Sequence, residues 1–119
     1  MKINELVETV HGMAKDKGWY EKDRSPLEAH MLMVSELAEA TEEVRKDLPP
    51  LYVRSGENLV TDMAVFDGRK PEGEAIELVD AVIRIADYFG YRGWDLEAAL
   101  RCKIDYNSRR PHRHGGKKY

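Results

Sequence analysis

Apolar residues recur at helical spacing at the start of the chain. From Ile3 to Ala14 they fall every three or four positions, which is the period of a helix with one apolar face. Asn4 is a suitable N-cap, lysines occupy the last turn, and Gly18 follows it. The pattern therefore predicts a first helix over roughly residues 5–17.

A second helix is predicted from a start signal and a stop signal. Residues 25–28 combine a serine, a proline, a leucine and a glutamate, an order that suits a capping box in front of an apolar run. The helix should begin at about Pro26 and end by Asp47 or Leu48. The two prolines at 49–50 disfavour helix in the residue before them and cannot donate a hydrogen bond within it.

The segment 49–73 lacks a helical period. Residues 51–53 and 63–66 have the composition of strands, and turn signals occur at 55–56 and 67–68. A short hairpin is one interpretation, and a long loop is the other. A loop of this length in a compact domain is usually functional or mobile, and this one could lie over the acidic residues described below.

A third helix is expected to begin near Glu72 to Glu74, where acidic residues fill its first turn. It should end at Tyr88 or Phe89, because Gly90 follows.

A fourth helix completes the pattern. Asp95 is a suitable N-cap, the helix should run from Leu96 to about Ser108, and Pro111 ends it. Short links at two of the three joints favour antiparallel neighbours. The expected fold is all-α, an antiparallel four-helix bundle with a long loop or short hairpin between the second and third helices.

Length and composition fit one domain. The chain has 119 residues, 42% of them hydrophobic and 34% charged, so we expect a single domain over residues 1–119. Every apolar run is far shorter than the 18 or so residues that a membrane span needs, and the N-terminal stretch lacks the apolar core of a secretory signal. The single cysteine, Cys102, cannot form a disulfide within the chain. These features favour a cytoplasmic protein without a membrane partner.

The net charge of −3 hides a basic end. Residues 109–119 carry five basic residues and no acidic one, and the rest of the chain holds 14 basic and 22 acidic residues, a net charge of −8. This tail has three interpretations: a solvated flexible end, a phosphate clamp or a weak nucleic-acid arm. It is not a P-loop, because its Gly-Gly-Lys follows no predicted strand and precedes no predicted helix.

Two short acidic motifs lie on predicted helices that are apolar nearly all round. Glu36 and Glu39 form the first, and Glu77 and Asp80 form the second. A spacing of three residues puts each pair on one helical face, and helices this apolar are normally buried. Carboxylates brought together there would repel, by roughly 4 kcal/mol for each close pair at an effective dielectric of 20. A hard cation such as Mg²⁺ would relieve the repulsion. The alternative is two ordinary solvated stripes, but two matched motifs favour the metal.

A cationic and polar face is predicted on the fourth helix, at Lys103, Tyr106, Asn107 and Arg110. Such a face can simply be solvated, but it also offers the charge-assisted donors that polyphosphate oxygens require. Trp19 likewise has two interpretations, which are packing against the core or loop and stacking on a nucleobase.

These residues resemble the all-α nucleoside triphosphate pyrophosphohydrolases of the MazG-like superfamily, which also includes phosphoribosyl-ATP pyrophosphatase and dimeric dUTP- and dCTP-hydrolysing enzymes. The resemblance covers most of the chain outside residues 47–67, and the two acidic motifs are specific only as a pair. The stretches that carry it are Ser35–Ala40 with Glu43, Lys70–Gly73, Glu77–Ile85, the pattern Lys103, Tyr106, Asn107, Arg110, Pro111, and Arg113–Lys117.

The resemblance implies a metal-dependent enzyme that cleaves a nucleoside triphosphate between its α and β phosphates, giving the monophosphate and pyrophosphate. Four carboxylates would ligate Mg²⁺ or Mn²⁺ and carry the catalysis: Glu36, Glu39, Glu77 and Asp80. Substrate contacts would come from Lys103, Tyr106, Asn107 and Arg110 at the phosphates and from Trp19 near the base. Glu39 is the candidate for the general base or for a bridging ligand. Family members assemble as dimers or tetramers, so a homodimer or homotetramer is expected.

Two other functions stay open. Hydrolysis of phosphoribosyl-ATP is the second enzyme activity, which the extra segment 47–67 disfavours. A non-catalytic helical module whose basic tail binds nucleic acid belongs to another class, and its affinity should collapse with added salt. We favour the nucleotide hydrolase over both, so nucleic acid is not an expected partner.

Overall fold

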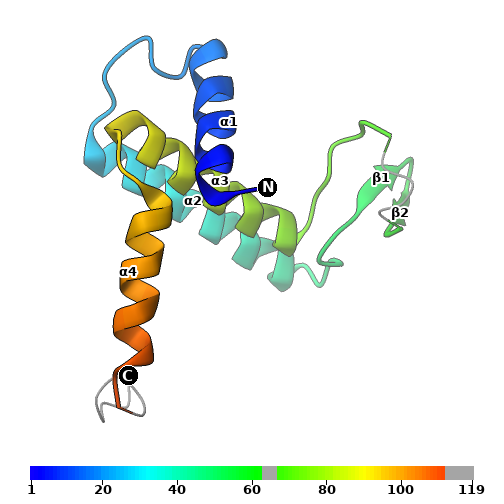
Figure 1. Ribbon diagram of the computed structural model, residues 1–119. Coiled ribbons are helices and arrows are strands. Elements are labelled where there is room, and N and C mark those ends of the chain that lie inside the picture. The colour runs from blue at the N-terminus through cyan, green and yellow to red at the C-terminus, as the bar shows by residue number, and fades with distance from the viewer. Residues whose placement is uncertain (63–66, 112–119) are drawn as a thin grey trace. The chain divides into compact units, whose positions relative to one another are not determined.

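The computed structural model describes residues 1–62 and 67–111 (Figure 1). Over these residues the chain is mostly helical, with four helices and one two-stranded sheet, in agreement with the predicted helical class. The elements are α1 (Ile3–Asp16), α2 (Pro26–Arg45), β1 (Val53–Ser55), β2 (Asn58–Val60), α3 (Glu74–Arg92) and α4 (Leu96–Ser108). Among the described residues, no helix is both long enough and apolar enough to cross a membrane.

The chain divides into two compact units that share α3. One unit contains residues 1–18 and the chain from residue 86 onward, and the other contains residues 19–85. The antiparallel four-helix bundle and the single domain over residues 1–119 stay predictions.

In the first unit, α1 begins two residues before its predicted start. Lys2 occupies the N-cap position, and its backbone N–H donates to Glu5 Oε2 at 3.3 Å. The prediction that Asn4 caps this helix is wrong, because the Asn4 side chain bonds to residues far away in the sequence. Its amide donates to Asp95 Oδ1 at 3.1 Å, and its carbonyl oxygen accepts from the Glu97 backbone N–H at 3.3 Å. Asn4 thus ties α1 to the start of α4.

The third helix runs one turn beyond its predicted end. It continues through Gly90 to Arg92 and stops at Gly93, whose φ is +71°. A Cβ atom at Gly90 would lie 2.6 Å from the Cβ of His11, so glycine here permits α1 to approach closely. Close packing outweighs the low helical propensity of glycine, and this is why the predicted end at Tyr88 or Phe89 was wrong.

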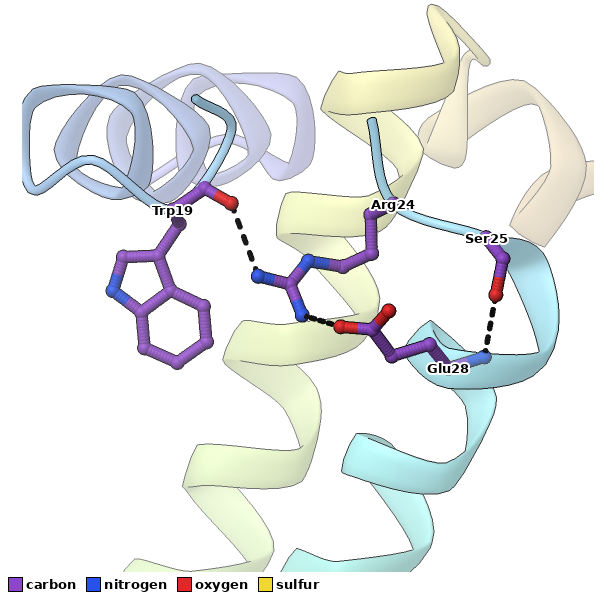
Figure 2. Close-up of polar contacts among 4 residues, drawn as sticks. All are labelled: Trp19, Arg24, Ser25 and Glu28. Carbon is purple, nitrogen blue, oxygen red and sulfur yellow. Dashed lines mark hydrogen bonds and ion pairs between the residues drawn. The ribbon is translucent and has the colours of Figure 1, made fainter. Parts of the chain in front are cut away.

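In the second unit, the predicted start of α2 is confirmed. Ser25 Oγ accepts from the Glu28 backbone N–H at 3.1 Å, with Pro26 in the first turn (Figure 2). The Glu28 carboxylate accepts from Arg24 rather than completing the predicted capping box. The helix ends at Arg45, within the predicted limit.

The predicted hairpin is present, but it is tighter than the sequence suggested. Strand β1 pairs antiparallel with β2, in a register that sets Val53 opposite Val60 and Ser55 opposite Asn58. The predicted second strand at 63–66 lies outside the described residues. Asn58–Val60 was not predicted as a strand; its pairing with β1 depends on the turn at Gly56, where φ is +60°.

Tyr52 anchors the segment that precedes the hairpin. Only 1% of its surface is exposed, and its hydroxyl donates to Glu43 Oε2 at 2.9 Å. Its backbone exchanges hydrogen bonds with Glu72, at 3.0 Å and 2.8 Å. The segment is therefore fixed to α2 at one point and to the residues before α3 at another.

The prediction that both acidic helices are buried holds for one face only. On α2 the buried positions are Ala29, Glu36 and Ala40. The opposite side of α2 and part of α3 expose large apolar residues: Leu27, Met31, Val34, Leu37, Val44, Leu78, Val79, Val82, Ile83 and Ile85. A helix that is apolar all round needs neighbours on every side, and the described residues of one chain do not supply them.

Candidate metal centre

Three of the four predicted carboxylates come together in the second unit. Glu36 and Glu39 lie one turn apart on α2, and Glu77 lies in the first turn of α3. One carboxylate oxygen from each lies within 4.8 Å of the others. Glu36 is buried, with 6% of its surface exposed, whereas Glu39 is exposed. We call these three residues the acidic cluster.

Asp80, the fourth predicted carboxylate, lies beside the acidic cluster. Burial raises the pKa of Asp80, and the negative charges of Glu36 and Glu39 raise it further, while the positive charges of Arg84 and Lys70 oppose the change. Asp80 is therefore within electrostatic reach of the cluster without belonging to its three closest oxygens.

The acidic cluster holds a proton near neutral pH. Burial, followed by the hydrogen bond and charge of Glu39, raises the pKa of Glu77 from 4.5 to about 7, and Glu36 and Asp80 add to the effect. Carboxylates this close cannot all be ionised without a counter-charge. The raised pKa of Glu77 is the direct consequence of burial and of the repulsion that the sequence predicted between these carboxylates.

The cluster also has one fixed cation, which sequence reasoning missed. Arg84 Nε donates to Glu36 Oε1 at 2.6 Å, and the guanidinium carbon lies 4.9 Å from the centre of the Trp19 ring. Arg84 lies four residues after Asp80, on the acidic face of α3, but this spacing indicates no partner for it. Its partner is 48 residues away in sequence, so no local pattern could identify the pair.

The donor set fits a hard divalent cation. Mg²⁺ binds oxygen ligands at about 2.0–2.1 Å in octahedral geometry, so ligands on opposite sides of one ion are about 4 Å apart. Oxygens within 4.8 Å of one another need only small side-chain movements to reach that spacing. All three donors are carboxylates, which suit Mg²⁺ or Mn²⁺ better than softer metals.

Two arginines, Arg24 and Arg84, contact Trp19. Its backbone carbonyl accepts from Arg24 Nη2 at 3.0 Å, and Arg24 Nη1 donates to Glu28 at 2.5 Å (Figure 2). The guanidinium of Arg24 lies 5.5 Å from the Trp19 ring centre, compared with 4.9 Å for Arg84. The side chain is 41% exposed, so Trp19 is not a core residue, and base stacking stays a prediction.

The predicted polar face of α4 lies in the first unit. Lys103 Nζ and the Arg110 guanidinium carbon lie 5.1 Å and 5.5 Å from the Tyr106 ring centre, so these three residues share one face, as their spacing predicted. Asn107 follows Tyr106 on the same helix and is exposed. Of the basic tail 109–119, residues 112–119 lie outside the described residues, and phosphate binding stays a prediction.

Comparisons with protein-family models, with curated proteins and with solved structures found no match for this chain. The resemblance to the MazG-like superfamily therefore stays a prediction from the sequence motifs. The close approach of the three carboxylates in the acidic cluster is an observation about the site that does not depend on that resemblance.

Proposed function

We propose that this protein is a Mg²⁺-dependent nucleoside triphosphate pyrophosphohydrolase, with Mn²⁺ as an alternative metal, that releases a nucleoside monophosphate and pyrophosphate. The observation that supports the proposal best is the acidic cluster, where three carboxylates from two helices meet within 4.8 Å. The raised pKa of Glu77, caused first by burial and then by Glu39, supports the same conclusion. Close carboxylates that raise the pKa of one of their number are typical of functional sites, and a cation would relieve their repulsion.

The four carboxylates would have different roles in metal binding and catalysis. Glu36, Glu39 and Glu77 would hold Mg²⁺, with Asp80 as the fourth acidic group. Bound Mg²⁺ would neutralise developing charge on phosphate oxygens and make a water molecule more acidic. Glu39 is the most accessible of the three, and we assign it to orient or deprotonate the attacking water, or to bridge metal ions. Glu36 is restrained by Arg84 and is better suited to a fixed ligand role.

The remaining assignments rest on the sequence resemblance. Lys103, Tyr106, Asn107 and Arg110 would bind phosphates, and Trp19 would contact the base. We also propose a cytoplasmic homodimer or homotetramer, which the exposed apolar residues of α2 and α3 support.

A panel of nucleoside triphosphates with pyrophosphate detection tests the activity. We expect Mg²⁺-dependent release of pyrophosphate that EDTA abolishes, and near-complete loss of turnover in Glu39→Gln and Asp80→Asn with the fold retained. Glu42→Gln is the matched control, because Glu42 is an exposed glutamate on the same helix outside the cluster. Full turnover in both site variants would return the acidic residues to the solvated-stripe interpretation.

The same experiment separates the other two functions. Phosphoribosyl-ATP belongs in the panel, and its selective hydrolysis would favour the second enzyme activity. A nucleic-acid module would instead hydrolyse nothing and bind duplex DNA with an affinity that falls steeply with salt.

The Lys103→Ala variant tests the proposed phosphate contacts of α4. If the Lys103 ammonium group contacts a phosphate, this variant should reduce kcat/KM roughly ten- to a hundredfold.

A further inference from the structure

We propose that Arg84 is a phosphate-binding residue of this site, with its two terminal amino groups available to the phosphate oxygens of the nucleotide. The proposal rests on the proposed function and adds a residue that the sequence resemblance did not place in the site. It starts from the position of Arg84, whose Nε donates to Glu36 of the acidic cluster and whose guanidinium carbon lies over the Trp19 ring.

The guanidinium of Arg84 is fixed at one donor and open at the others. Nε donates to Glu36 Oε1 at 2.6 Å. Within residues 1–62 and 67–111, the two terminal amino groups of Arg84 make no hydrogen bond or ion pair. The side chain is 26% exposed, so a ligand can reach it. An arginine carries five N–H donors in a rigid fork, and four of those donors belong to the terminal groups.

Contact with Trp19 further restrains the guanidinium of Arg84. A guanidinium whose carbon lies 4.9 Å from an indole centre is held by cation–π attraction, and the bond to Glu36 restricts its rotation. The side chain is therefore ordered before a ligand arrives, which lowers the entropy lost on binding. Paired parallel N–H donors match two oxygens of a phosphate group.

The charge balance favours phosphate over another acceptor. A nucleotide held by the acidic cluster through Mg²⁺ would bring its phosphates beside Glu36, where Arg84 is the cation in direct contact. Phosphoryl transfer requires positive groups around the transferring and departing phosphates. The carboxylates cannot meet that need, and Arg84 has donors left to do so.

The test compares metal binding with pyrophosphate binding in Arg84→Gln, Arg84→Lys and the control Arg54→Gln. Arg54 is the matched control because its guanidinium also covers an aromatic ring, that of Tyr52, and pairs with a carboxylate, that of Glu72. Mn²⁺ binding is followed by electron paramagnetic resonance. Binding of pyrophosphate with Mg²⁺ is followed by tryptophan fluorescence, and Trp19→Phe verifies that the signal comes from Trp19 rather than Trp94.

We expect Arg84→Gln to bind Mn²⁺ at least as tightly as the native protein but to weaken pyrophosphate binding roughly ten- to a hundredfold. Arg84→Lys keeps the charge without the fork, so its pyrophosphate affinity should fall between the two. Arg54→Gln should leave both affinities unchanged. The same ranking should appear in kcat/KM for the nucleotide that the native protein hydrolyses.

Two results would overturn the assignment. Native pyrophosphate affinity in Arg84→Gln would show that the fork meets no phosphate. Alternatively, Arg84→Gln could lose both Mn²⁺ and pyrophosphate binding while Arg84→Lys restores both. That result would show that Arg84 acts only through its charge, by positioning Glu36, and does not bind phosphate. Failure of the proposed function itself looks different, because the native protein would then neither bind Mn²⁺ nor release pyrophosphate from any nucleotide.

Discussion

At the scale of single residues, Glu77 links the acidic cluster to pH. Its pKa in the folded protein, about 7, exceeds its ordinary value of 4.5 because of burial and the neighbouring carboxylates. Between these two values the folded state binds more protons than the unfolded state. Folding is therefore favoured by Glu77 below about pH 4.5, and this contribution is lost as the pH rises through about 7.

The first prediction is that the metal-free protein loses thermal stability between pH 5 and pH 8, and that Glu77→Gln loses less over the same range. Glutamine cannot lose a proton, so the comparison isolates Glu77 from other titrating groups. Thermal unfolding in EDTA measures both slopes. Equal slopes would contradict the raised pKa of Glu77.

The second prediction is that Mg²⁺ counteracts the loss of thermal stability at higher pH. Mg²⁺ needs ionised ligands, so its addition should raise the melting temperature more at pH 8 than at pH 6. At 100 times Kd the stabilisation is about 2.7 kcal/mol. Glu42→Gln should behave as the native protein does, whereas thermal scans of the native protein that coincide with and without Mg²⁺ would exclude a metal site at the cluster.

Residue spacing predicted part of the site and could not predict the rest. The three-residue interval between Glu36 and Glu39 fixes their common face, and matched motifs suggested that Glu77 would join them. The interval says nothing about burial, which differs between Glu36 and Glu39. Residue spacing also could not identify the contacts of Arg84 with Glu36 and Trp19, because these contacts depend on how α2, α3 and the loop before α2 pack.

At the scale of elements, the segment between α2 and α3 depends on one glycine. Gly73 has φ +116°, and a Cβ atom there would lie against the carbonyl group of Pro50. The adjacent Glu72 exchanges backbone hydrogen bonds with Tyr52. The start of α3, and with it the position of Glu77, therefore relies on a backbone shape that only glycine adopts easily.

The third prediction is that Gly73→Ala destabilises the protein by about 2 kcal/mol or more, since backbone strain and overlap with Pro50 add. Gly56→Ala is the control. Gly56 also has a positive φ, +60°, but a Cβ added there would meet nothing within 4 Å, so this variant should lose less stability. Urea unfolding measures both variants, and equal losses would show that the contact with Pro50 does not matter.

The fourth prediction concerns the hydroxyl that holds this segment to α2. Tyr52→Phe removes the hydrogen bond to Glu43, and a bond to a charged group contributes about 1.5–3 kcal/mol. Glu43→Gln keeps an acceptor and should lose less. Unfolding free energies of both variants and of the double variant would give the coupling between the two side chains; zero coupling would contradict the anchor.

Element boundaries were predictable where a cap is local. Ser25 and Asp95 cap α2 and α4 through backbone N–H groups three residues later, and sequence shows such caps directly. Asn4 and Gly90 misled the prediction because their roles come from another element, α4 for Asn4 and α1 for Gly90. The hairpin was predicted, but its second strand was placed too far along the chain, because strands of three residues give too short a pattern to locate from the sequence.

At the scale of the whole molecule, one chain leaves apolar surface on both helices that carry the cluster. Leu27, Met31 and Val34 follow one face of α2 and are 76%, 61% and 50% exposed. Exposed apolar residues that continue along a helix are typical of interaction surfaces rather than of isolated monomers. A second copy of the chain offers the same apolar face, and a two-fold interface requires such self-complementarity.

The fifth prediction follows from that surface. The native protein should be a dimer or tetramer by size-exclusion chromatography with light scattering, and its melting temperature should rise with protein concentration. Val34→Glu should shift the population to monomer, because burying an unpaired carboxylate in an interface is unfavourable. Glu42→Lys changes an exposed polar position of the same helix and should leave the assembly intact. A native protein that is monomeric at all concentrations, with a melting temperature equal to that of Val34→Glu, would show that this face has another use.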